Sequence, residues 1–580
     1  MGKSVITGIV VGVLLFAQWG TSVEGQTRFT LPGIPNPLVA DGEVGRFGGT
    51  FVLTQISDPS TFSWRMIRDD ASSGPTELFT EGLVEAHGLT TEIIPALAES
   101  WTVGKDGRTW VFKLREGVKW FDGVEFTADD VIFNFNVIFD PKIPNQTKDQ
   151  LTIADKPITF RKLGKYKIEF KTPVPFGPFL RNIGTGLQPK HILEQAWNEG
   201  RFTQMWGINT PPKELIGTGP YIMQSYVPGQ RITFLRNPNY YRVDKKGQRL
   251  PYLARVVRVI VPNLEASRLK FEAGETDTYA VRGVEFAAFK AREQQGNYTL
   301  YEGGPTFTLN FLALNLNPRG IRPPKLTWFS NQKFRQAVAH AVDKRTLIAQ
   351  VFASRAVEQW GPVPIPAKAF YDESALKKYP YDLRRAEQLL AEAGFTKGGD
   401  GFLRDRDGNV VEFVLSTNAG NTEREAMGNI ISTDLRKLGM KVAFTPEAFP
   451  SLVSKLTTSF NWEAIIIGLT GGVDAHVPTY WRSDGALHLW NPRQDNPATP
   501  WEIEMDRLVD QGASTVDQAK RKEIYKRLQE IVSDQVPLIF LVAPTVHTAV
   551  RNTLGNIRYG GAFGGVLWNL EEIFYKTPYR

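Results

Sequence analysis

Around residue 112, large apolar side chains recur at every second position. Trp110, Phe112 and Leu114 fall on one face of an extended chain, and the opposite face carries Thr109 and Lys113. A hydrophobic period of two residues is typical of a β-strand with one buried face. The pattern therefore predicts a half-buried strand at this point of the chain.

A few residues later the hydrophobic period becomes that of a helix. Thr127 and Asp130 form a Thr-x-x-Asp capping pattern, and Val131, Phe135 and Ile138 recur on one side of the segment behind it. A hydroxyl side chain followed three residues later by a carboxylate is a typical helix start. The sequence predicts a strand, a turn and a capped helix in succession.

Strand-like and helix-like segments alternate along much of the remaining chain. Residues 256–261 form a nearly continuous β-branched run, which favours a strand covered on both faces. Residues 334–342 repeat apolar side chains at helical spacing, and Asp382 caps a second helix that ends at Gly394. Residues 410–470 alternate in the same way. We therefore predict an α/β fold.

Length, charge and cysteine content narrow the class of protein. The chain has 580 residues, which predicts two or three domains. Its formal net charge is +7, but the basic residues are scattered, so they are interpreted as a solvated surface. The basic residues form no stripe along the sequence, so nucleic-acid binding is not predicted. Cysteine is absent, which excludes disulfides, thiolate metal sites and cysteine nucleophiles.

The first 25 residues have the organisation of a secretory signal peptide. Lys3 precedes an apolar run over residues 5–17, and small or permissive residues at 23 and 25 fit cleavage before Gln26. The alternative is a single membrane anchor, although the run is shorter than the roughly 20 residues that a spanning helix needs. We expect a periplasmic or extracellular protein without a lipid-anchor cysteine.

Nine short motifs follow one another over most of the chain beyond residue 26. The most specific spans residues 95–133, and the others lie at 78–83, 189–191, 217–221, 236–241, 274–277, 334–344, 389–395 and 521–537. In this order they closely resemble the motifs of the family 5 solute-binding proteins of ABC importers, the group that contains dipeptide- and oligopeptide-binding proteins.

The resemblance implies a periplasmic-binding-protein-like α/β fold with two hinged lobes and an extra α+β domain. Residues 26–76, 190–310 and 531–580 would form lobe I, residues 77–189 the extra domain, and residues 311–530 lobe II. It also implies a monomer without enzymatic activity, which closes on a ligand and delivers it to the permease subunits of an ABC transporter.

In the peptide-binding proteins that the chain resembles, an Asp in a Gly-Trp-x-x-Asp segment holds the α-amino group. The matching stretch is 468–474, where Leu469 replaces the Trp and Gly472 stands at the aligned Asp position. Asp474 lies two residues later and could take the role only if the loop is longer. The alternative is that Asp474 forms an Asx turn beside Gly471 and Gly472.

The segment that follows is rich in aromatic and polar side chains. Trp481, Trp490 and His476 suit packing on peptide side chains, and the tryptophans also suit stacking on a sugar ring. The alternative is that both tryptophans are core residues. His476 and His488 are near each other in sequence, but no spacing resembles a zinc site, so no metal is predicted.

Thr54, Gln55 and Ile56 follow the first predicted strand, where the family offers backbone hydrogen bonds to an extended ligand. No catalytic motif or cofactor signature is found, and the glycine-rich residues 560–565 are interpreted as a turn. The resemblance implies peptides as the leading ligand class, while the altered segment at 468–474 and the aromatic residues after it favour oligosaccharides as the second. The rival class is a secreted glycan hydrolase, which would use a pair of carboxylates.

Overall fold

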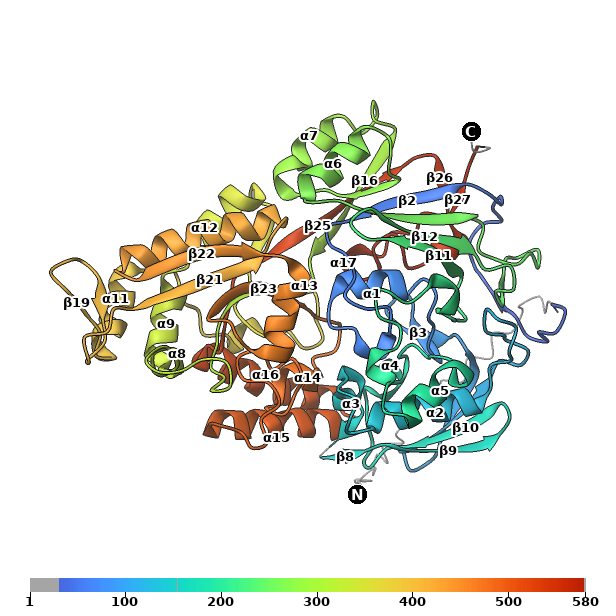
Figure 1. Cartoon of the computed structure of the whole chain (residues 1–580), viewed down its shortest axis with the longest axis horizontal. Helices are drawn as coiled ribbons and strands as arrows, with labels where there is room; N and C mark the ends of the chain where they lie inside the picture. Colours follow the sequence, from blue (N-terminus) through green and yellow to red (C-terminus); the bar gives the residue numbers. More distant parts are fainter. Residues whose placement is uncertain (1–30, 154, 578–580) are drawn as a thin grey trace, which may run out of the picture.

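The computed structural model describes residues 31–153 and 155–577. The predicted signal peptide, residues 1–25, lies outside the described residues. Sheets and helices divide the molecule into two lobes and a third unit that packs beside the first lobe (Figure 1). The predicted two-lobed α/β class with an extra domain is confirmed.

The first lobe is built on two sheets. One has the strand order β11 (Tyr221–Val227), β12 (Arg231–Arg236), β14 (Arg255–Ile260) and β2 (Thr50–Gln55), with β14 and β2 parallel. In the other, β25 (Val542–Arg551) lies between β15 (Thr278–Ala280) and β16 (Tyr298–Pro305). Helices α6 (Leu264–Glu272) and α7 (Phe286–Ala291) belong to the same lobe.

The prediction that residues 256–261 are covered on both faces is wrong in one respect. β14 is paired along both edges, by β12 and β2, but only Val256 is fully buried among its six residues. Four of its side chains are partly exposed, and one of these, Arg258, lines the cleft described below.

The third unit contains the strand and the capped helix that the sequence predicts over residues 109–138. Its sheet has the order β5 (Ala98–Val103), β6 (Thr109–Leu114), β10 (Lys167–Lys171) and β9 (Thr159–Gly164). Helix α2 (Ala128–Phe139) follows with the predicted cap: Asp129 N donates to Thr127 Oγ1 over 3.3 Å, and Thr127 N donates to Asp130 Oδ2 over 2.9 Å. The predicted strand and the predicted capped helix are both confirmed.

The second lobe has a five-stranded sheet. Its order is β22 (Lys441–Glu447), β21 (Glu412–Asn418), β23 (Ala464–Thr470), β17 (Thr308–Leu314) and β24 (Leu538–Phe540). Side chains of β17 alternate between two cores: Phe311 packs on one face of the sheet and Leu312 on the other. The helices of the lobe include α9 (Gln332–His340), α11 (Leu383–Glu392), α12 (Thr422–Lys437), α15 (Pro500–Ser514) and α16 (Gln518–Gln535).

Two chain segments pass side by side between the lobes. One joins β16 to β17, and the other joins β24 to β25. Thr306 N on the first donates to the carbonyl of Pro544, near the start of β25, over 2.9 Å. The sheet of the second lobe takes in residues 308–310 and 538–540, which the sequence prediction had placed in lobe I. In the described part of the chain, every helix is too short or too polar to cross a bilayer.

Candidate functional site

A cavity of about 630 Å³ lies between the two lobes. A smaller one of about 250 Å³ adjoins it, and the two have Asp70, Arg424 and Phe449 in common. The first lobe contributes the end of β2, part of α1 (Asp70–Thr76) and Arg258 of β14, while the second contributes the end of β21 and the start of α12. We call this combined space the interlobe cleft.

The wall that the second lobe contributes to the cleft lies at the carboxyl ends of the parallel strands β21 and β22. The carboxyl end of β21 leads through a turn into α12, which places Asn418, Asn421 and Arg424 at the cleft. Open α/β sheets typically bind ligands at this edge. Asn421 Oδ1 accepts the backbone N–H of Arg424 over 3.0 Å, so the side chain that caps the helix also fixes the start of the wall.

Arg424 is held in place by groups of its own lobe. Its Nη1 donates to Asn418 Oδ1 over 2.9 Å and its Nη2 to Asn310 Oδ1 over 3.4 Å. A side chain at Gly468 would place its Cβ 2.8 Å from Nη2, so glycine there makes room for the guanidinium. Burial lowers the pKa of Arg424, and the negative charge of Asp70 opposes that shift.

Asp70 faces Arg424 from the first lobe. Asp69 caps α1 by accepting the N–H of Ser72 over 2.8 Å, and Asp70 as the next residue extends into the cleft. The protein around the cleft displaces water and thereby raises the pKa of Asp70, while Arg424 opposes the rise. Although their charges interact, Asp70 and Arg424 form no direct ion pair with each other. Asp70 and Arg424 therefore present opposite charges to the cleft from opposite lobes.

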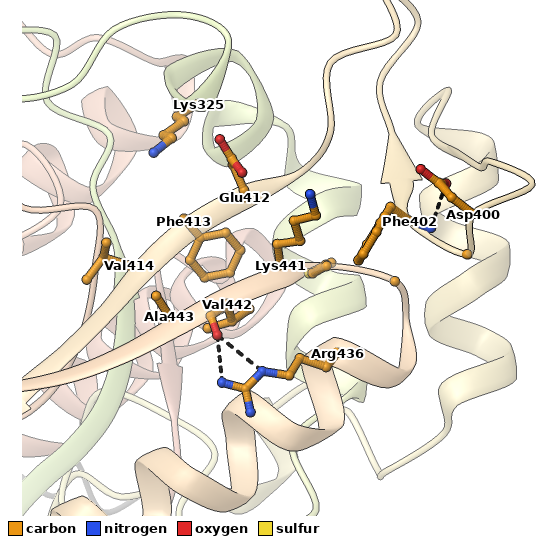
Figure 2. A pocket seen from close by; sticks show the side chains of 13 residues that line it. Lys325, Asp400, Phe402, Glu412, Phe413, Val414, Arg436, Lys441, Val442 and Ala443 are labelled. Atoms are coloured by element: carbon orange, nitrogen blue, oxygen red, sulfur yellow. Dashed lines mark hydrogen bonds between the residues drawn. The ribbon is translucent and has the colours of Figure 1, made fainter.

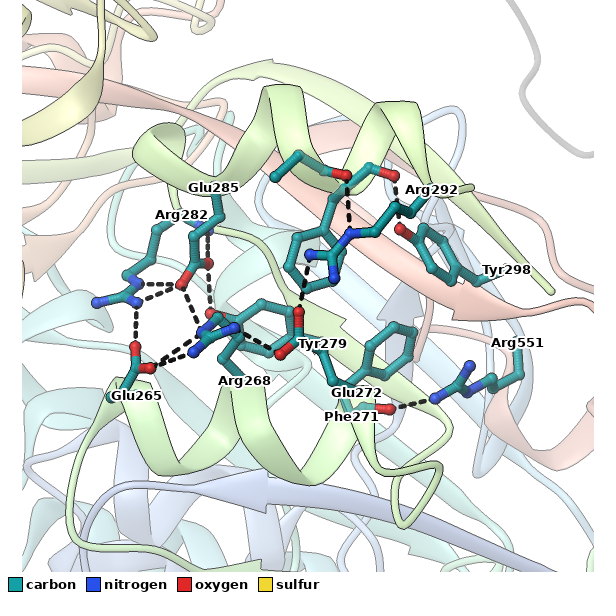
Figure 3. A network of polar contacts seen from close by, with 12 residues as sticks. Glu265, Arg268, Phe271, Glu272, Tyr279, Arg282, Glu285, Arg292, Tyr298 and Arg551 are labelled. Atoms are coloured by element: carbon teal, nitrogen blue, oxygen red, sulfur yellow. Dashed lines mark hydrogen bonds and ion pairs between the residues drawn. The ribbon is translucent and has the colours of Figure 1, made fainter. Parts of the chain in front are cut away.

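Contacts across the cleft hold the lobes together. Thr470 Oγ1 of the second lobe donates to Asp70 Oδ1 over 3.5 Å, and Arg282 Nη1 of the first donates to Thr422 Oγ1 over 3.0 Å. Arg282 belongs to a network with Glu265 and Glu285 (Figure 3). The lobes therefore form direct hydrogen bonds with each other, of which the Thr470–Asp70 bond is exposed and the Arg282–Thr422 bond is partly buried.

The second lobe also touches the third unit. Arg482 Nη2 pairs with Asp155 Oδ1 at 2.6 Å, and the backbone N–H of Ala486 donates to Asp149 Oδ2 over 3.1 Å. All three parts of the molecule thus contact one another around the cleft.

Three of the residues singled out from the sequence, Thr54, Gln55 and Ile56, line the cleft. Thr54 Oγ1 hydrogen-bonds to Ser267 Oγ, and Gln55 Oε1 accepts Arg258 Nε over 2.7 Å. The side chains of Thr54 and Gln55 are therefore engaged within the first lobe. Contact of these three residues with a ligand stays a prediction.

Asp474 does not line the cleft. Its carboxylate pairs with Arg521, with Nη2 at 2.8 Å from Oδ1 and Nη1 at 3.1 Å from Oδ2. Its Oδ1 also accepts the backbone N–H of His476 over 2.9 Å, the two-residue spacing of an Asx turn. The structure thus contains the turn that the sequence offered as the alternative, and a ligand contact by Asp474 stays a prediction.

Trp481, Trp490 and His476 lie inside the second lobe, with 1%, 1% and 7% of their surfaces exposed. Both tryptophans belong to the core on one face of its sheet. Burial lowers the pKa of His476 to about 4, so its imidazole is neutral at pH 7. Their neighbours Tyr480, Leu487 and Leu489 line the smaller cavity instead. This segment therefore forms part of the cleft wall, and Trp481 and Trp490 pack behind that wall.

The sequence predictions missed most of the polar cleft wall. Asp70, Arg258, Asn418, Asn421 and Arg424 all lie on it. Asn418 and Asn421 could have been found, since polar residues at the carboxyl end of a parallel strand are a recognised signal. The glycine-rich segment interpreted as a turn forms a short helix, α17 (Gly561–Gly564), which also lines the cleft.

Another cavity of about 640 Å³ lies on the outer part of the second lobe, beside β21 and β22 (Figure 2). Arg436 on its wall already donates to the carbonyl of Val442, at 2.7 and 3.2 Å, and Asp400 accepts the N–H of Phe402 over 3.2 Å. Residues of a single lobe line it, so closure of the two lobes could not enclose a ligand there. The interlobe cleft is the stronger candidate site.

Replacing Asp474 with alanine is expected to lower the free energy of unfolding by about 3 kcal/mol, because Arg521 would remain buried without its carboxylate. Denaturant titration measures this loss. Asp474→Asn is the matched control, since it keeps an acceptor for the N–H of His476 and should cost less. If Asp474 also contacts a ligand, Asp474→Ala will weaken peptide binding more than sugar binding, and unchanged affinities would exclude the contact.

The architecture and the cleft define a two-lobed binding protein of the periplasmic type. Residues 92–487 match the family described as bacterial extracellular solute-binding proteins, family 5, middle region. The chain belongs to this family and is a family 5 substrate-binding protein of ABC transporters.

Individual relatives agree with this assignment. A probable ABC transporter-binding protein of Deinococcus radiodurans is 31% identical over 530 residues, which cover 87% of this chain and 88% of that protein. The oligopeptide-binding protein AppA of Bacillus subtilis is 25% identical over 525 residues, covering 88% and 89%. Its structure with a nonapeptide superposes with a TM-score of 0.80 over 92% of this chain and all of that one.

The same fold occurs with a different ligand. The binding protein MelB of Agrobacterium fabrum C58, solved with stachyose, superposes with a TM-score of 0.83, at 22% identity, over 94% of this chain and 89% of that one. Proteins similar to this chain thus include one solved with a peptide and one solved with a sugar.

Proposed function

We propose that this protein is exported, captures peptides in the interlobe cleft and delivers them to the permease of an ABC importer. The observation that carries the proposal is the opposition of Asp70 and Arg424 across the cleft. A peptide is a zwitterion, and it offers an ammonium group to a carboxylate and carbonyl or carboxylate oxygens to a guanidinium. The name of the Bacillus subtilis relative supports the same ligand class.

Capture needs no catalytic step. Two lobes that each make part of the contacts bind a ligand best when they close on it, so the ligand shifts the equilibrium toward the closed form. Thr470–Asp70 and Arg282–Thr422 are contacts that such closure would make. The closed form would then be the one that a permease recognises.

Oligosaccharides are the second candidate ligand. The cleft wall also carries the neutral polar side chains of Ser57, Asn418 and Asn421, and the rings of Phe449 and Phe563. Amides, hydroxyls and aromatic faces suit a sugar as well as a peptide. The stachyose complex shows only that the shared fold accommodates a sugar in that protein.

The residues of the cleft support the activity of a glycan hydrolase less well. Among the described residues, its walls carry two carboxylates, Asp69 and Asp70. Asp69 is committed to the cap of α1 and to the hydroxyl of Ser60, which donates to Oδ2 over 2.6 Å. A glycosidase uses two carboxylates that flank the scissile bond, and this pair of adjacent residues is not so arranged.

Peptides added to the purified protein are expected to raise its melting temperature, because a ligand that binds only the folded state stabilises it. At 100 times the Kd the gain is about 2.7 kcal/mol. The measurement is a thermal shift assay with peptides of three to six residues, and with maltotriose and stachyose as the sugar arm. A shift of the melting temperature with sugars alone would show that oligosaccharides, not peptides, are the ligands. Release of a reaction product from any of the compounds would favour the hydrolase.

A further inference from the structure

Arg258 stands at the boundary between the interlobe cleft and a second cavity. This second cavity, of about 530 Å³, lies behind the cleft, between the first lobe and the third unit. Leu53, Arg258 and Leu567 line both spaces. A group bound at Arg258 would therefore lie at the inner end of the cleft, with open volume on either side of it.

The guanidinium of Arg258 lacks a counter-ion at contact distance. Its Nε donates to Gln55 Oε1 over 2.7 Å. Across the described ranges of the chain, neither Nη nitrogen has an acceptor, and no carboxylate forms an ion pair with it. Arg424 differs, since both of its Nη nitrogens already have acceptors and it faces Asp70. A partly buried cation without a partner is unfavourable unless something else supplies one.

The backbone near Arg258 is shaped to hold the guanidinium in position. A Cβ at Gly74 would lie 2.6 Å from Nη2 and 3.1 Å from Cζ of Arg258. Gly74 is inside helix α1, where glycine costs about 0.5–1 kcal/mol relative to alanine. The glycine thus lets the guanidinium lie against the helix, while Gln55 fixes its other side. These contacts leave the Nη donors without an acceptor among the described residues and therefore available to a ligand.

We propose that Arg258 forms an anion subsite that binds a carboxylate of the ligand, so that the preferred ligands carry a free carboxyl group. This inference rests on the proposed function, and it narrows the ligand class to peptides with a free C-terminus over neutral sugars. Arginine suits the role because its two parallel N–H donors match the two oxygens of a carboxylate.

The nearest acidic side chain does not replace such a ligand. Glu77 influences Arg258 electrostatically but forms no ion pair with it, and burial raises the pKa of Glu77 to about 7. Near neutral pH, Glu77 is therefore only partly ionised. Burial lowers the pKa of Arg258 to about 10, which leaves it charged. The positive charge of Arg258 is thus incompletely balanced before a ligand binds.

The test compares tri- to hexaalanine with the same peptides as C-terminal amides, by isothermal titration calorimetry. The wild-type protein is expected to bind the free acids at least about 30-fold more tightly, as two charge-assisted hydrogen bonds would give. Arg258→Gln should bind acid and amide alike, and Gly74→Ala should reduce the preference by displacing the guanidinium. Arg255→Gln is the matched control, because Arg255 is an exposed arginine on the same strand.

The outcomes separate the inference from the proposed function. Equal binding of acids and amides by the wild type overturns the anion subsite and leaves peptide capture intact, and so does a preference that survives in folded Arg258→Gln. If no peptide binds, trigalacturonate is compared with maltotriose. Preference for the acidic sugar then supports the subsite while peptide capture fails, and binding of maltotriose alone overturns both.

Discussion

Replacing Arg424 with alanine is expected to weaken ligand binding by about 100- to 1,000-fold, as truncation of a desolvated charged contact does. Arg424 lines both parts of the interlobe cleft and is the cation that faces Asp70. Without it, Asn418 Oδ1 loses a donor and Asp70 loses the charge that opposes the rise of its pKa. Calorimetry with the best peptide of the thermal shift assay measures the change.

The matched control for Arg424 lies on the same helix. Arg436→Ala removes an exposed arginine that lines the outer cavity of Figure 2 and not the cleft. It should leave the affinity within about twofold, with at most a modest loss of stability. The reverse result, a loss of affinity in Arg436→Ala with Arg424→Ala unchanged, would move the site from the interlobe cleft to the outer cavity.

Replacing Glu502 with alanine is expected to destabilise the protein by about 4 kcal/mol, because two buried donors and one partly buried donor would lose their acceptor. Glu502 is 2% exposed, and its Oε1 accepts Trp490 Nε1 over 3.0 Å, His488 Nε2 over 3.2 Å and Gln494 Nε2 over 3.0 Å. These residues anchor the aromatic segment behind the cleft wall. Denaturant titration, followed by tryptophan fluorescence, measures the loss.

The stability that Glu502 contributes decreases as the pH falls. Burial alone would raise the pKa of Glu502, but hydrogen bonds from His488, Gln494 and Thr499 and the charge interaction with His488 outweigh burial and hold it at about 2. A lowered pKa contributes stability above the unfolded-state value, and the contribution is lost as pH falls toward 2. The shift from 4.5 to about 2 is worth about 3 kcal/mol. Glu502→Ala should therefore lack this acid-dependent loss.

Glu504 supplies the comparison on the same helix. It forms a surface pair with Arg527, so Glu504→Ala should cost less than about 1 kcal/mol. If Glu502→Ala keeps wild-type stability yet loses ligand binding, the aromatic segment is a binding element rather than a support. Loss of stability with the affinity of the remaining folded protein preserved is the result that the structure predicts.

How far the sequence could predict the fold depends on how local each signal is. The Thr127 cap and the alternation around Phe112 are set by residues within a few positions of one another, so the pattern alone gives them. The position of Thr54 at the cleft came instead from the family resemblance, and the structure places Thr54 within β2 on the cleft wall. By contrast, Trp490 looks the same in sequence whether it stacks on a ligand or fills a core.

The amino-acid sequence by itself determined the α/β class and the family resemblance, and that resemblance implied two lobes that close on a ligand. Only the tertiary structure decided which charges meet there. Asp70 and Arg424 come from segments far apart in the chain, and Arg258 is placed by a glycine on a different element. The structure also assigned Trp481 and Trp490 to the core and paired Asp474 with Arg521. Hydrophobic periodicity records how each element packs, whereas burial of a charge and its partners depend on contacts between elements, which no local pattern contains.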